Sequence, residues 1–142
     1  KSIYSKGSKM SDHSVNLQKA IFDKLDQDGT LQGLVTDVYD FVPESTAFPY
    51  VKIGVGSSVD NGTKTLKGSD FTLEVSSFSR YRGSKEAKEI MSRVYDLLHE
   101  ADISVSGASL VFIRFEFSDI IKENDGLTTH GFQRFRALVN DT

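Results

Sequence analysis

Residues 76–101, SSFSRYRGSKEAKEIMSRVYDLLHEA, contain the clearest secondary-structure signal in the chain. From Ser84 onward the apolar residues recur at the spacing that places side chains on one face of an α-helix. They are Ala87, Ile90, Met91, Val94, Leu97, Leu98 and Ala101. Charged residues fill the other face, where Lys85 and Glu89 stand one helical turn apart and favour an ion pair. This amphipathic helix needs a sheet or a second helix to cover its apolar face.

The remainder of the chain predicts a second helix and several strands. A helix is expected over residues 15–25, with Ser14 as its N-cap. Strands are expected at residues 38–42, 50–55, 71–78, 110–117 and 128–139, the last two as a hairpin. In the strand at 110–117, alternation should place Val111, Ile113, Phe115 and Phe117 on one face.

This order of elements, α-β-β-β-α-β-β, favours a two-layer α+β domain. We expect a mostly antiparallel sheet of four to five strands with two helices packed on one face. The 142 residues suit a single domain, at residues 14–142, preceded by residues 1–13 as a flexible N-terminal arm or a remnant of an expression vector.

Composition and motifs argue against an enzyme. The chain has no cysteine, which excludes disulfides, thiolate metal sites and a cysteine nucleophile. His13, His99 and His130 are too far apart in sequence to form a metal-binding motif, and no nucleotide-binding or serine-nucleophile motif is complete. We therefore expect no catalytic residues, no metal and no cofactor. No segment approaches the roughly 20 apolar residues that span a bilayer, so no membrane association is expected.

Two segments are candidates for binding. The basic-aromatic turn Arg80, Tyr81, Arg82 and Gly83 resembles a nucleic-acid contact, but the net charge of −3 favours a structural role in which Tyr81 covers the helix start and the arginines pair with acids. Arg114, Arg134 and Arg136 are likewise expected to be solvated or paired across strands. Residues 54–69, GVGSSVDNGTKTLKGS, predict a long mobile hairpin tip or a binding loop.

Four stretches together resemble one protein family. They are LQKAIFDKL (17–25), VYDFVPESTAFPYVKIG (38–54), FSRYRGSKEAKEIMSRVYDLLHEA (78–101) and DGLTTHGFQRFRALV (125–139). In order and spacing, from about residue 16 to residue 139, they are similar to the tail completion or tail terminator family of long-tailed phages and gene transfer agents. Phe78 stands where the family often has Trp, so an aromatic residue is retained.

The resemblance implies a structural virion protein. Such a protein would form a homohexameric ring that caps the tail tube, ends its polymerisation and joins the tail to the head–tail connector or stopper protein. The expected partners are other copies of the chain, the tail tube protein, the connector, and DNA that passes through the lumen without sequence-specific binding. The expected location is the head–tail junction of a virion or phage-like particle assembled in the host bacterial cytoplasm.

Two site hypotheses follow from this resemblance. Arg80, Tyr81, Arg82 and Gly83 would form a subunit or connector interface, and a second segment would dock on the tail tube. The docking residues would be Ser57, Ser58, Asp60, Asn61, Gly62, Thr63, Lys64 and Lys67. A head–tail connector or neck protein is the alternative within the structural class, and a small single-strand nucleic-acid-binding module is the alternative from another class.

Overall fold

The computed structural model describes residues 9–60 and 68–141, with side chains described for residues 13–56 and 68–141. The elements are α1 (Lys9–Asp26), α2 (Gly29–Gln32), β1 (Asp37–Tyr39), β2 (Tyr50–Asp60), β3 (Gly68–Ser79), α3 (Lys85–Leu98), β4 (Ala108–Lys122) and β5 (Thr129–Asp141). The five strands form one sheet in the order β1-β2-β3-β5-β4. β1 is parallel to β2, and the other neighbouring strands are antiparallel.

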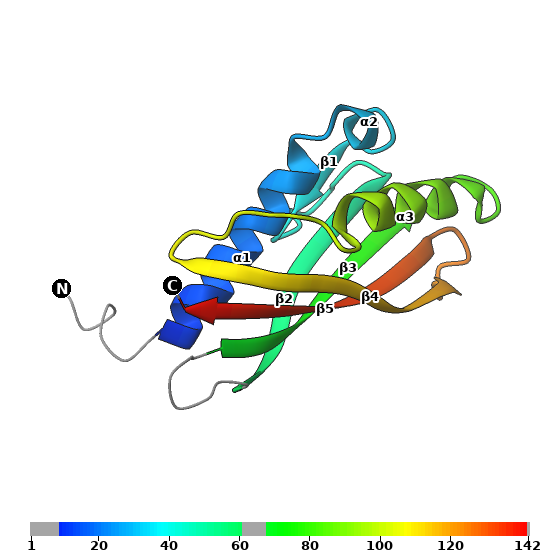
Figure 1. Cartoon of the computed structure of the whole chain (residues 1–142). Coiled ribbons are helices and arrows are strands. Elements are labelled where there is room, and N and C mark those ends of the chain that lie inside the picture. The colour runs from blue at the N-terminus through cyan, green and yellow to red at the C-terminus, as the bar shows by residue number, and fades with distance from the viewer. Residues whose placement is uncertain (1–8, 61–67, 142) are drawn as a thin grey trace.

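The two long helices, α1 and α3, lie on the same side of the sheet (Figure 1). The predicted two-layer α+β fold with two helices on one face is therefore confirmed, and the short helix α2 is added between α1 and β1. Within the described part of the chain, no helix is both long and apolar enough to cross a membrane.

The apolar stripe of α3 forms the centre of the core, as its spacing predicts. Ala87, Ile90, Met91, Val94, Leu97 and Leu98 are buried. Ile90, Val94, Leu97 and Leu98 belong to one cluster with buried residues of α1, such as Leu17 and Ile21, and of the sheet, such as Leu73 and Phe135. Because alternate residues of β3 and β5 point toward the helices, the other half of each strand lies on the open face of the sheet.

A bidentate ion pair also holds α3 to the start of α2. Asp28 caps α2 by accepting a hydrogen bond from the Leu31 N–H at 2.8 Å. Its carboxylate also accepts from Arg93 Nε at 2.9 Å and from an Arg93 terminal nitrogen at 2.7 Å. These hydrogen bonds with Arg93 hold the pKa of Asp28 below its usual value. Arg93, one of the charged residues on the polar face of the helix, thus joins two helices. The predicted ion pair of Lys85 and Glu89 forms on the surface, with 2.9 Å between Lys85 Nζ and Glu89 Oε2.

Helix α1 begins at Lys9, earlier than the predicted start, so Ser14 lies inside the helix and is not its N-cap. A long-range contact accompanies the earlier start. His13 is buried, and its Nε2 contacts the Asp141 carboxylate at the far end of the chain. Residues 1–8 lie outside the described part of the chain.

The predicted face of β4 is wrong at two positions. Ile113 is buried and Phe115 is packed against the core, but Val111 is 51% exposed and Phe117 is 45% exposed. The pairing of β4 with β5 shifts register twice, between Leu110 and Phe112 and between Phe115 and Phe117. Each shift is a β-bulge, which reverses the alternation of faces.

The predicted loop at residues 54–69 is in part strand. β2 continues to Asp60 and β3 begins at Gly68, with Asp60 paired to Ser69. The register shifts between Val55 and Ser58, the interval that contains Gly56. Of the predicted docking residues, Ser57, Ser58 and Asp60 belong to β2, whereas Asn61, Gly62, Thr63, Lys64 and Lys67 lie outside the described residues.

Candidate interaction surface

Arg80 connects three loops at one end of the sheet. Its Nε donates to Thr128 Oγ1 at 3.0 Å, and a terminal nitrogen lies 3.5 Å from Asp125 Oδ2 in the same β4–β5 turn. Its guanidinium also lies 4.2 Å from the ring centroid of Phe48, in the loop between β1 and β2. The expectation that Arg80 pairs with an acid is confirmed, and the residue fixes the relative positions of the loops.

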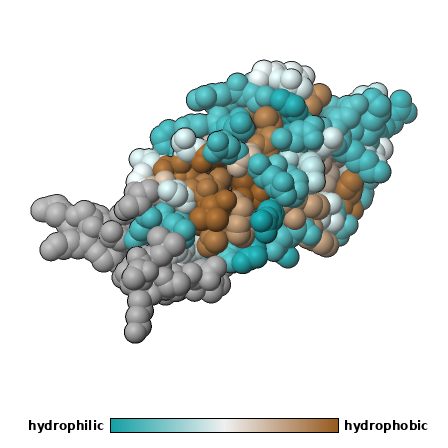
Figure 2. All heavy atoms as spheres, viewed as in Figure 1, coloured by the Kyte–Doolittle hydropathy of each residue, from teal (hydrophilic) through white to brown (hydrophobic). Residues whose placement is uncertain are grey.

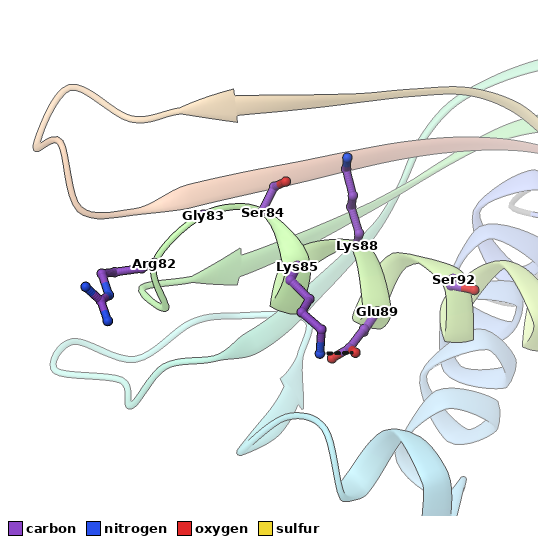
Figure 3. Close-up of a pocket in the computed structure, with 7 residues that line it drawn as sticks. All are labelled: Arg82, Gly83, Ser84, Lys85, Lys88, Glu89 and Ser92. Atoms are coloured by element: carbon purple, nitrogen blue, oxygen red, sulfur yellow. Dashed lines mark hydrogen bonds and ion pairs between the residues drawn. The ribbon is translucent and has the colours of Figure 1, made fainter.

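The other residues of the predicted turn are exposed, as Arg80 is. Tyr81 is 63% exposed, so it does not cover the start of α3, although its N–H donates to the buried Ser79 Oγ at 3.2 Å. Gly83 has a φ of 75°, a conformation that favours glycine. Arg82 is exposed and borders an open depression of about 570 Å³ along the first turns of α3 (Figure 3). The side chain of Arg82 points away from the Lys85–Glu89 ion pair.

The β4–β5 turn beside Arg80 is held by Asp125. Its Oδ1 accepts from the N–H groups of Leu127 and Thr128, each at 2.8 Å, and its Oδ2 accepts from the Thr128 hydroxyl at 2.7 Å. The hydrogen bonds from Thr128, followed by the one from Leu127 and the nearby charge of Arg80, lower the pKa of Asp125 to about 2. Asp125 therefore stays charged and keeps the turn rigid at neutral pH.

A row of aromatic side chains crosses the open face of the sheet from β1 to β4. Neighbouring rings lie 4.4 to 6.4 Å apart between centroids, and the central pairs, Tyr50 with Phe78 and Phe78 with His130, are stacked. The row consists of Tyr39, Tyr50, Phe78, His130, Phe132 and Phe117. It brings together residues far apart in the sequence. Local alternation does not predict it, because the sequence pattern places Phe117 on the core face of β4.

The row ends at β4 in a group of arginines and rings, which we call the arginine–aromatic patch. It comprises Phe112, Arg114, Phe117, Phe132 and Arg134. The Arg114 guanidinium lies 4.2 Å from the ring centroid of Phe112. The Arg134 guanidinium lies 5.6 Å from that of Phe117 and 5.8 Å from that of Phe132. These cation–π contacts position both guanidinium groups beside rings on the open face of the sheet.

Arg136 differs from these two arginines, because its Nε donates to both oxygens of Asp70 on β3, at 2.7 and 2.8 Å. Of the two expected outcomes for these arginines, solvation or pairing across strands, Arg136 shows pairing. Figure 2 shows apolar residues gathered over the first half of β4, next to hydrophilic ones. This edge of the sheet therefore presents both apolar surface and two arginines, Arg114 and Arg134, that pair with no carboxylate among the described residues.

The two predicted sites lie at opposite ends of the β2–β3 hairpin. Tyr50 pairs with Phe78 at the end that carries Arg80 to Gly83, and Asp60 pairs with Ser69 at the other. At about 3.3 Å per residue, the length of β2 separates the two ends by about 30 Å. Within the described residues, no group of three His, Cys, Asp or Glu side chains could hold a metal ion.

Comparison with known proteins places this chain in a family. Residues 19–140 match the family model described as tail completion protein gp17. The tail completion protein gp17 of Bacillus phage SPP1 is 30% identical over 127 residues, which cover 88% of this chain and 92% of that protein. A chain in the virion of a native gene transfer agent particle has a TM-score of 0.82 and 31% identity, covering 87% of this chain and 94% of that chain.

The solved structure of bacteriophage SPP1 gp17 has a TM-score of 0.64 and 25% identity, covering 96% of this chain and 95% of that chain. Both structural relatives come from tailed phage or phage-like particles, and the family model spans nearly all of the described fold. The chain belongs to the tail completion protein gp17 family, whose members are structural proteins of phage and gene transfer agent particles.

Proposed function

We propose that this protein forms a homohexameric ring that caps the tail tube, ends its polymerisation and joins the tail to the head connector. Membership in the tail completion family carries the proposal, because a protein that completes a tail must contact other tail and head components. Ring formation requires surfaces that pair between copies. The open sheet face supplies aromatic and arginine side chains, among them the exposed Phe117 and Arg114, and these residue types are enriched at protein interfaces.

The layout of the domain supports two different contacts along its length. A subunit that links a tube to a connector needs a binding surface at each end, and the two predicted sites are about 30 Å apart along β2. We assign the turn at Arg80 to Gly83 to a neighbouring subunit or the connector. We assign residues 57–67, of which 61–67 lie outside the described part, to contact with the tube.

DNA would pass through the lumen of this ring without being bound tightly. The net charge of −3 gives the ring no overall attraction for the phosphate backbone. The aromatic row is also a poor platform for single strands. The faces of Tyr50, Phe78 and His130 stack on one another, so they are covered by neighbouring rings and not open to bases.

Two measurements separate the alternatives. Purified tail tubes should retain this protein in a pull-down, whereas a head–tail connector or neck protein would bind heads and leave the tubes in the wash. A labelled oligonucleotide should show no salt-dependent binding, since such binding would support the nucleic-acid module instead.

Electron microscopy of the particle tests the proposal itself. The expected image shows a six-fold ring of this chain at the head-proximal end of the tube. Density for the chain at another place in the particle, or as single copies, would contradict the proposed function.

A further inference from the structure

The loop that follows β1 is acidic and presents an exposed aromatic ring. Between Lys24 and Lys52 the chain has no basic residue. Asp40 and Glu44 are exposed, Phe41 between them is 79% exposed, and neither carboxylate forms an ion pair within the described residues. We call Asp40, Phe41 and Glu44 the acidic loop. An exposed phenylalanine between two unpaired acids is suited to a surface that is both apolar and positive.

Hydrogen bonds hold this loop in a defined shape. The Thr36 hydroxyl lies 2.8 Å from the carbonyl oxygen of Ala47 and 3.0 Å from that of Pro49. Within the loop, the Thr46 hydroxyl donates to the Pro43 carbonyl. A loop that is already ordered loses little conformational entropy on binding, which favours its use as a docking element.

The arginine–aromatic patch has the complementary properties. Neither Arg114 nor Arg134 forms an ion pair with a described carboxylate, although Glu74 lies opposite Arg134 in the pairing of β3 with β5. Phe117 beside them is 45% exposed. Two arginines that are positioned by rings and have no carboxylate partner among the described residues can bind two carboxylates from another molecule.

The two surfaces lie at opposite edges of the same sheet. β1, which leads into the acidic loop, is one edge strand, and β4, which carries much of the patch, is the other. Four strand spacings of about 4.8 Å put the edges about 19 Å apart, so the two surfaces cannot meet within one chain. Complementary surfaces on opposite sides of one molecule pair head to tail, and such pairing closes into a ring when the rotation between copies is suitable.

We infer that the acidic loop of one copy docks on the arginine–aromatic patch of the next copy, with Phe41 against the rings and Asp40 and Glu44 facing Arg114 and Arg134. The inference rests on the proposed ring and names the surfaces that build it. It leaves the turn at Arg80 to Gly83 available for the connector.

Charge reversal in assembled particles tests this interface. Arg114→Glu with Arg134→Glu should lower the fraction of heads that carry tails about tenfold, and Asp40→Lys with Glu44→Lys should do the same, because each places like charges in contact. The quadruple variant, which exchanges the two charges, should recover most of the joining. Lys19→Glu, on an exposed position of α1 away from both surfaces, is the matched control and should assemble normally.

Thermal melting of each purified variant checks folding, and the loop variant is the safer one because both of its positions are exposed. The interface is wrong if the loop variant joins heads and tails at the wild-type level, or if a folded quadruple variant is as defective as its parents. Microscopy of wild-type particles separates this result from the proposed function. A ring with unaffected variants rejects only the interface, and the absence of a ring rejects both.

Discussion

Replacing Arg80 with alanine should destabilise the domain, whereas replacing the neighbouring Arg82 should not. Both arginines are exposed, but they differ by their contacts. Arg80 reaches Thr128, Asp125 and the Phe48 ring, whereas Arg82 has no hydrogen bond, ion pair or ring contact within the described residues. Their comparison separates the structural role of this turn from its binding role.

The expected magnitude follows from the contacts of Arg80. A cation–π contact at a partly exposed site contributes about 0.5 to 1 kcal/mol, and a hydrogen bond such as the one to Thr128 contributes about 1 kcal/mol. The half-exposed pair with Asp125 adds little because water screens it. The free energy of unfolding should therefore fall by about 2 kcal/mol in Arg80→Ala, which corresponds to a loss of about 6 °C in melting temperature.

Urea unfolding followed by circular dichroism measures this difference. Arg82→Ala should change the free energy of unfolding by less than about 0.5 kcal/mol, as is usual for surface positions. In a double-mutant cycle with Phe48→Leu, the coupling energy should be about 0.5 to 1 kcal/mol. Equal stabilities for Arg80→Ala and Arg82→Ala would show that Arg80 does not tie the loops together.

Three further outcomes are expected. The Asp125 carboxyl should titrate near pH 2 by NMR, and Thr128→Val should raise its pKa. Because folding lowers this pKa, the carboxylate stabilises the fold fully above about pH 4, and this stabilisation is lost as the pH falls through 2. Titration of the carboxyl at its ordinary pKa would contradict this stabilisation. Gln133→Leu should raise the free energy of unfolding, measured in urea, by about 1 kcal/mol. The buried Gln133 Oε1 has no hydrogen-bond partner among the described residues, and burying it unpaired costs more than the hydrogen bond from Nε2 to the Met91 carbonyl contributes. A clear loss of stability would contradict this. Deleting residues 61–64 should leave the melting temperature within a few degrees and yield unattached or overlong tails in electron micrographs, whereas normal tails would remove this segment from tube docking.

The sequence predicts the helix-on-sheet layer well because its signal is local. The stripe of α3 depends only on spacing, and every residue in it from Ala87 to Leu98 is buried. The strand faces of β3 follow from simple alternation, with Phe71, Leu73 and Val75 buried.

Predictions fail where pairing between distant segments overrides the local pattern. The bulges in β4 reverse its alternation, so Phe117 faces the open side of the sheet. Residues 54–60, the start of the predicted loop, form a strand although they are rich in glycine and serine, because β3 pairs with them as far as Asp60. The extra turn at the start of α1 accompanies a contact between His13 and Asp141.

The candidate surface is the least accessible to sequence analysis. Arg80 to Gly83 is recognisable as a basic-aromatic turn, but its partners Phe48 and Thr128 come from other loops. The aromatic row and the arginine–aromatic patch require the strand order and both register shifts, neither of which a single sequence supplies.

Electron microscopy of the head–tail junction in native particles can locate this chain directly. Six copies of the chain should form a closed ring on the last ring of the tail tube, with the open sheet edges at the contacts between copies. Particles that have normal tails and heads but carry this chain anywhere other than in a ring at that junction would contradict it.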